Sequence, residues 1–129
     1  MIKFLYADEF IKDFTKLKKA YHSLWWYDGL EWDFGDLKKA LMQLPTWLWW
    51  VERINNLGND IVLPVYKVRK FACKALQSTT KLRIIYSYDT TQEIVHFIQF
   101  IEIYAKADKD NEDRDRIKKV LLWKSTLWN

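Results

Sequence analysis

A run of basic residues without an acidic one is the feature of this sequence best suited to chemistry. Between Ile61 and Tyr88 the chain carries six lysines and arginines and no aspartate or glutamate. The formal net charge of the whole chain is +4, so positive charge is concentrated in this segment. Such segregated charge predicts an anionic partner, either nucleic acid or an acidic polypeptide. The alternative is a solvated strand surface whose lysines discourage aggregation.

Three cations in this segment have a spacing that suits phosphate chemistry. Lys67 and Arg69 are two residues apart, so on a strand they point to the same face. Arg83 on the next strand can join them if the register permits. Arginine stays charged and holds phosphate oxygens with a planar fork, so we assign Arg69 and Arg83 to a phosphate clamp. Crowding by other cations favours a neutral lysine, which makes Lys67 the candidate general base.

Further basic and aromatic residues extend this candidate surface. Tyrosines on the predicted strands can stack on RNA bases, although alternating strand residues more often face the core. Lys106 follows the last predicted strand, as either a phosphate contact or a solvated strand-end lysine. The residues assigned to RNA or phosphate binding are Lys70, Lys74, Lys81, Lys106, Tyr86 and Tyr104, with Tyr88 as a further stacking candidate.

Metal chemistry has little support in the sequence. His22, His96 and Cys73 do not have the spacing of a metal or catalytic site, so both histidines are predicted to be structural. The acidic run from Asp108 to Asp115 lacks the central glycine of a calcium-binding EF-hand loop. Its carboxylates suit the start of a helix, where the helix dipole favours negative charge. We therefore predict no metal and no cofactor.

The N-terminal half is predicted to form a strand and a helical hairpin. Met1 to Tyr6 is a short apolar run, and from Asp8 to Leu24 apolar residues recur at three- and four-residue spacing. Gly29 marks a break before a second helical pattern from Phe34 to Leu44. Trp47 to Ile54 is predicted as a short helical continuation.

The C-terminal half is predicted to form most of the sheet. After a turn at Gly58, three β-rich runs follow: Ile61 to Cys73, Leu82 to Tyr88, and Ile94 to Tyr104. The second and third form a hairpin, and the third is apolar enough to lie in mid-sheet. A helix from about Glu112 to Trp123 ends an α+β fold of order β-α-α-β-β-β-α, with an antiparallel sheet packed on the N-terminal hairpin.

Four pieces of the chain, in this order, resemble toxins of the RelE/ParE superfamily from bacterial and archaeal toxin–antitoxin pairs. They are Tyr66 to Leu76, Leu82 to Tyr88, Ile101 to Asp108, and Arg114 to Ile117. The resemblance covers nearly the whole chain and implies one toxin domain over residues 1–129, inhibited by a cognate antitoxin that wraps it. It implies either a metal-independent endoribonuclease that cuts mRNA on the ribosome or a relative that inhibits DNA gyrase, because both share this fold.

Two positions depart from the ribosome-dependent nucleases of this family. Ala107 replaces an arginine that follows the last-strand lysine, and Asp113 replaces a tyrosine early in the final helix. An acidic residue near a phosphate site would repel the substrate. An mRNA interferase is the leading interpretation, and a gyrase inhibitor or a degenerate, non-toxic family member is the alternative.

Tryptophans around the predicted hairpin indicate contact with another protein. Six of the eight cluster there, and tryptophan is enriched at interface hot spots. The expected partner is the amphipathic helix of the antitoxin or a second copy of the chain, whereas the alternative is a bulky core. The residues assigned to this contact are Trp25, Trp26, Trp47 and Trp50.

The sequence gives no support for secretion or for a membrane span. Cys73 is the single cysteine, and no charged and then apolar leader opens the chain. Apolar runs such as Trp47 to Val51 are far shorter than the roughly 20 residues that cross a bilayer. We therefore expect a cytoplasmic protein.

Overall fold

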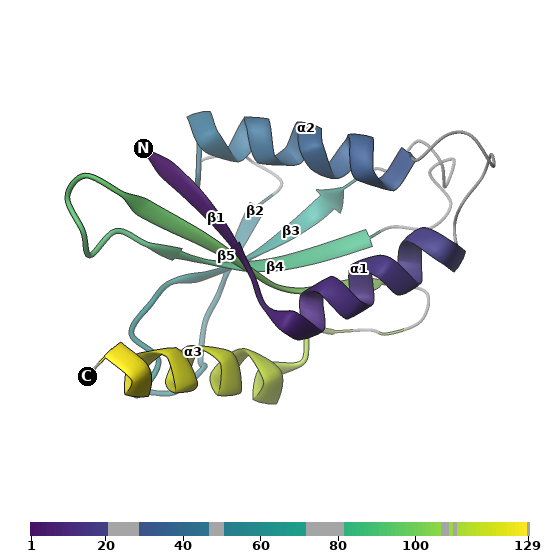
Figure 1. Cartoon of the computed structure of the whole chain (residues 1–129). Helices are drawn as coiled ribbons and strands as arrows, with labels where there is room; N and C mark the ends of the chain where they lie inside the picture. Colours follow the sequence, from purple (N-terminus) through teal and green to yellow (C-terminus); the bar gives the residue numbers. More distant parts are fainter. Residues whose placement is uncertain (21–28, 47–50, 72–81, 107–108, 110, 129) are drawn as a thin grey trace.

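The fold is α+β, with a five-stranded sheet and three helices among the described residues (Figure 1). The computed structural model describes residues 1–20, 29–46, 51–71, 82–106, 109 and 111–128. The elements in chain order are β1 (Ile2–Tyr6), α1 (Asp8–Ala20), α2 (Gly29–Gln43), β2 (Val51–Ile54), β3 (Val65–Phe71), β4 (Leu82–Asp89), β5 (His96–Ala105) and α3 (Arg114–Trp128).

The sheet has the strand order β1-β5-β4-β3-β2. The apolar strand β5 lies inside the sheet and pairs with β4 as an antiparallel hairpin, which confirms both expectations for this strand. The expectation of a wholly antiparallel sheet is wrong, because β1 runs parallel to β5, with Tyr6 opposite Phe100. In this register the rings of Phe4 and Tyr6 stack on Phe100, with centroid distances of 5.8 and 5.7 Å. Core packing therefore selects this edge and direction for β1.

The helical continuation expected from Trp47 to Ile54 is wrong for its described part. Val51–Ile54 is strand β2, antiparallel to β3, whereas residues 47–50 lie outside the described residues. A run this short does not distinguish helix from strand by its periodicity. Pairing with the edge of β3 decides, and it buries Ile54 beside Val65. The order is therefore β-α-α-β-β-β-β-α.

Two strands begin later than their apolar runs predicted. β3 begins at Val65 rather than Ile61, because Pro64 has no N–H to donate to a neighbouring strand. β5 begins at His96 rather than Ile94, whose side chain is exposed. Apolar composition extended both predictions into connecting segments.

Two helices also begin at positions other than those expected. α2 begins at Gly29 rather than Phe34, and α3 begins after Asp113 rather than at Glu112. Asp113 caps α3, since its Oδ1 accepts a hydrogen bond from the backbone N–H of Arg116 at 3.1 Å. This contact confirms that helix-start acidity accounts for Asp113.

The helices cover both faces of the sheet, with α1 and α2 on one face and α3 on the other (Figure 1). On the first face Phe10 and Phe34 pack on Phe100, with ring centroids 5.5 and 4.9 Å away, so the predicted packing of a helical pair on the sheet is confirmed. On the second face Ile85 and Ile117 belong to a smaller buried cluster beneath α3. Because side chains alternate along a strand, residues two positions from Ile85 point to the same side of the sheet as α3.

Candidate functional site

Three polar side chains from three adjacent strands lie on the α3 face of the sheet. Lys67 pairs with Ile85, and Arg83 pairs with Tyr104. Ile85 and Tyr104 both belong to the cluster beneath α3, so Lys67 and Arg83 point to that same side. The structure thus brings together Lys67, Arg83 and Tyr104, a set that we call the Arg83 cluster.

Arg83 is a nearly buried cation. Its side chain is 9% exposed, and its hydrogen bond among the described residues runs from Nη1 to the Leu82 carbonyl at 3.3 Å. It has no ion pair with any carboxylate of the described residues. A guanidinium has five N–H donors, and no Arg83 nitrogen is both fully buried and without a partner, so the remaining donors keep limited contact with solvent. A charge with so little hydration and no ion partner costs part of the several kcal/mol of a buried ion. An anion bound at Arg83 would remove that cost.

Tyr104 adds a second unmatched donor beside Arg83. The residue is 6% exposed, and its hydroxyl has no hydrogen-bond partner among the described residues. Burial, followed by the negative charges of Glu112 and Glu102, raises the pKa of Tyr104 to about 12, although the positive charge of Arg83 acts in the opposite direction. The hydroxyl therefore keeps its proton at neutral pH and can donate it to an anion.

Lys67 does not have the purely cationic surroundings expected from the sequence. Its Nζ donates a hydrogen bond to Glu112 Oε2 at 2.8 Å, with the two side chains 15% and 6% exposed. Burial raises the pKa of Glu112, but the hydrogen bond and charge of Lys67 and the charge of Arg114 outweigh burial and lower it. Glu112 is therefore ionised at neutral pH. The expectation of cations unopposed by carboxylates is wrong for Lys67, because Glu112, two residues before α3, reaches it.

Arg69 is also paired with a carboxylate, but at the surface. Its Nη1 lies 2.9 Å from Glu52 Oε2 on β2, and both side chains are more than half exposed. A surface pair of this kind contributes about 0–1 kcal/mol. Glu52 lies opposite Lys67, so the pair of Arg69 and Glu52 lies on the Lys67 side of the sheet, as predicted. Unlike Arg83, Arg69 is exposed and has a carboxylate partner.

Glu102 is a site residue that the sequence analysis missed. It is 2% exposed on β5 and pairs with Lys109, while its Oε1 accepts a hydrogen bond from the backbone N–H of Asp113 at 2.9 Å. These contacts hold the segment between β5 and α3, and Lys109 Nζ lies 5.3 Å from the ring centroid of Tyr104. A single carboxylate within an apolar strand was the signal that could have identified it.

The other predicted tyrosines do not form a stacking surface. Tyr86 is buried on the α1–α2 face and donates a hydrogen bond to the Pro45 carbonyl at 2.5 Å, so its assignment to base stacking is wrong. Tyr88 Oη lies 3.1 Å from His96 Nδ1, which confirms a structural role for that histidine. Lys106 is exposed just beyond β5, where the sequence placed it.

Several predicted residues lie outside what the structure describes. They are Trp25, Trp26, Trp47, Trp50, Lys74, Lys81, His22, Cys73, Ala107 and the side chain of Lys70. Within the described residues, no three histidine, cysteine or acidic side chains form a group that could hold a metal ion. No helix in that same part of the chain has the length and apolar character needed to cross a membrane.

No protein-family model, curated protein or solved structure matches this chain. Its function is therefore inferred from the Arg83 cluster and from the resemblance of its sequence pieces.

Proposed function

We propose that this chain is a toxin of the RelE/ParE type, inhibited by a cognate antitoxin, which cleaves mRNA on the ribosome. The four ordered sequence pieces support the family, and the Arg83 cluster supports an RNA phosphate as the target. The observation that carries the proposal is Arg83, a nearly buried guanidinium without a carboxylate partner among the described residues. Such a group gains most from binding an anion.

A phosphodiester suits the donors of this cluster. A guanidinium can hold two phosphate oxygens through parallel N–H groups, and each charge-assisted bond is stronger than a neutral one. The Tyr104 hydroxyl can donate to a phosphate oxygen, and Lys67 adds a second positive charge. In a cleavage that uses no metal, these groups would stabilise the negative charge that develops on phosphorus oxygens.

We assign proton abstraction from the RNA 2′-hydroxyl to Glu112, the carboxylate that contacts Lys67 of the cluster. Its pKa is lowered by the pairing with Lys67, so it is an ionised acceptor at neutral pH. When a phosphate draws Lys67 away, the carboxylate loses its cation and becomes a stronger base. The 2′-oxygen then bonds to phosphorus, the bond from phosphorus to the 5′-oxygen breaks, and the leaving 5′-oxygen takes a proton from water. We therefore assign Lys67 to phosphate binding and Glu112 to proton transfer, a change from the base role first expected for Lys67. General-base catalysis contributes about 10²–10⁴-fold to a rate.

To reach the cluster, RNA must displace Glu112 and Lys109, two described residues between β5 and α3. Glu112 holds Lys67, and Lys109 lies over Tyr104. The ion pairs of these two residues would exchange for contacts with phosphate. Entry of RNA therefore competes with the internal carboxylates.

The same carboxylates favour a second candidate function, a toxin that does not cleave RNA. Pairing of Lys67 with Glu112 and of Arg69 with Glu52 neutralises two of the three predicted cations. A neutralised surface attracts a polyanion less strongly and suits a protein target better. A gyrase-inhibiting toxin, or a member of the family that has lost toxicity, would retain this arrangement.

The two candidates are separated by assaying the purified full chain on both targets. Ribosomes programmed with mRNA are incubated with the protein and cleavage is mapped by primer extension, while gyrase supercoiling is measured in parallel. We expect cleavage that requires ribosomes and leaves gyrase unaffected. Inhibition of supercoiling without cleavage would establish the second candidate, and neither activity, with no harm on expression, would indicate a non-toxic member.

Matched variants connect the activity to the cluster. Arg83→Met and Lys67→Met should each reduce cleavage at least tenfold, whereas Arg53→Met, which changes an exposed arginine on β2, should retain it. Glu112→Gln should reduce cleavage while binding phosphate at least as tightly as the unaltered protein, because a competing carboxylate is removed. Full cleavage by Glu112→Gln would exclude its proton-transfer role.

A further inference from the structure

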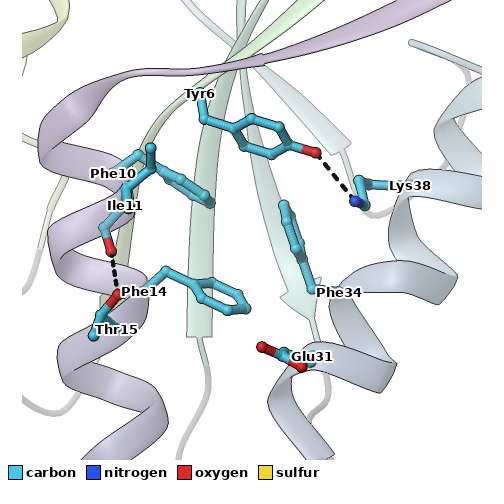
Figure 2. Close-up of a pocket in the computed structure, with 8 residues that line it drawn as sticks. All are labelled: Tyr6, Phe10, Ile11, Phe14, Thr15, Glu31, Phe34 and Lys38. Atoms are coloured by element: carbon cyan, nitrogen blue, oxygen red, sulfur yellow. Dashed lines mark hydrogen bonds between the residues drawn. The ribbon is translucent and has the colours of Figure 1, made fainter.

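A hollow between α1 and α2 lies on the face of the sheet opposite the Arg83 cluster. It has a volume of about 380 Å³, within the range of small-molecule sites. Figure 2 shows Phe10 and Phe14 reaching from α1 toward Phe34 on α2, with Tyr6 and Lys38 at one end and Glu31 at the other. Nothing in the proposed RNA chemistry uses this hollow.

The floor and wall of the hollow are aromatic and tightly packed. Phe10 and Phe34 are nearly buried, with ring centroids 5.6 Å apart, and Phe14 lies 5.2 Å from Phe34. Phe34 also packs edge-on against Phe100 of the sheet, so its ring is held from below. Phe10 and Phe34 are thus largely covered by the protein, and the partly buried Phe14 between α1 and α2 offers ring surface that a flat aromatic group can contact.

One end of the hollow carries donors that are not matched by a carboxylate. Lys38 Nζ donates a hydrogen bond to Tyr6 Oη at 3.1 Å and lies 5.2 Å from the ring centroid of Phe34. No ion pair to a carboxylate of the described residues engages this half-buried lysine. The ammonium has further N–H groups, and the Tyr6 hydroxyl, which accepts from Lys38, keeps its own hydrogen to donate. Two adjacent donors beside an aromatic floor fit a carboxylate.

The opposite end of the hollow limits the charge of the ligand. Glu31 lies seven residues before Lys38 on α2, about 10 Å along the helix axis, and pairs with Lys18 on α1 at 2.5 Å. A second anionic group at that end would meet this carboxylate and be repelled. The hollow therefore offers a cation for one carboxylate and not for a second, because Lys18 at the far end is engaged by Glu31.

We propose that this hollow binds a small planar aromatic monocarboxylate, with the carboxylate on Lys38 and Tyr6 and the ring against Phe14, in the hollow that Phe10 and Phe34 also line. The inference is independent of the RNA chemistry, because the two sites lie on opposite faces of the sheet and share no residue. Binding would join α1 to α2 across the hollow and stabilise the folded chain.

The probe for this site is 2-naphthoate, titrated into the isotope-labelled full chain and followed by amide chemical shifts. We expect saturable shifts centred on Phe34 and Lys38. Lys38→Met should weaken binding about fivefold to tenfold, since a charge-assisted contact is lost at a partly exposed site. Lys119→Met, which removes an exposed lysine on α3, should bind as the unaltered protein does.

Two further ligands test the charge argument on the unaltered protein, where folding of a variant is not in question. The neutral 2-naphthamide should bind at least fivefold more weakly than 2-naphthoate, and 2,6-naphthalenedicarboxylate should also bind more weakly because of Glu31. Equal affinity for the amide would show that Lys38 is not used. Absence of saturable shifts with millimolar 2-naphthoate, or shifts centred on α3, would overturn the proposal.

Discussion

Replacing Arg83 by methionine should stabilise the fold while it removes anion binding. Methionine keeps most of the apolar stem of the arginine, so the loss of packing is small. The substitution removes a charge that is 9% exposed and has a single 3.3 Å hydrogen bond to the Leu82 carbonyl among the described residues. A buried charge costs several kcal/mol without a partner, and methionine here should avoid part of that cost.

We expect the free energy of unfolding of Arg83→Met to exceed that of the unaltered protein by about 1–2 kcal/mol. This is well below the full penalty for a buried ion, because the guanidinium retains some solvent contact and one hydrogen bond. For a chain of this length, about 1 kcal/mol raises Tm by roughly 3–6 °C. Urea unfolding in chloride buffer measures the change, with Arg53→Met as the exposed control, which should move by less than about 0.5 kcal/mol.

The same unfolding series in added phosphate separates a binding site from a general salt effect. An anion that binds only the folded chain stabilises it by about 2.7 kcal/mol at a concentration one hundred times its Kd. Exclusion of phosphate from the protein surface acts on all variants alike, so the difference between variants reports binding. If Arg83→Met lost more than about 1 kcal/mol of unfolding free energy, Arg83 would not be a destabilising buried charge. If phosphate stabilised this variant as much as the unaltered protein, Arg83 would not bind the anion.

Three other changes test the surroundings of Arg83. Glu112→Gln should destabilise the fold by about 2 kcal/mol at pH 7 because it leaves Lys67 unpaired. Since the pKa of Glu112 is lowered in the fold, this contribution is complete above the ordinary pKa of a glutamate and disappears as the pH falls through the lowered value. The difference between the two proteins in urea unfolding should therefore decrease steadily as the pH is lowered below the pKa of an ordinary glutamate, and a constant difference would contradict the ion pair. Tyr104→Phe should change the free energy of unfolding by less than about 0.5 kcal/mol, because the Tyr104 hydroxyl has no partner among the described residues. The variant should nevertheless be stabilised less by added phosphate in urea unfolding. A loss of unfolding free energy above about 1.5 kcal/mol would indicate a hydrogen bond to the hydroxyl. Glu102→Gln should lower the free energy of unfolding in urea by about 2–4 kcal/mol, since it removes the carboxylate that pairs with Lys109 and approaches Arg116. The control Glu31→Gln, at an exposed ion pair, should lower it by less than about 1 kcal/mol. Equal losses would contradict the role of Glu102 in holding Lys109 and Asp113 before α3.

Local patterns determined most of the secondary structure of this chain. Apolar spacing predicted the helix that begins at Asp8, and the alternation and composition of β-rich runs predicted β4 and β5 as a hairpin. These features depend on residues close in sequence. For the same reason the pattern failed at Val51–Ile54, where pairing with β3, and not local preference, makes a strand.

The face of the candidate cations could also be predicted from the sequence, because strand side chains alternate with a period of two. Lys67 and Arg83 lie on one side of the sheet as that period requires, once the register of β3 on β4 is given. Their charge partners could not be predicted. Glu112 reaches Lys67 from 45 positions further along the chain, because α3 packs on that face.

The types of side chain available to the site, and the strands that carry them, therefore follow from local patterns along the chain. Which charges are neutralised, and which donors remain unmatched among the described residues, depends instead on how the elements pack. The physical reason is that ion pairing and burial depend on distances between segments remote in sequence, set by the docking of α3 on the sheet. Arg83 is unpaired among the described residues and Lys67 is paired because of that docking, although both lie in the same basic segment.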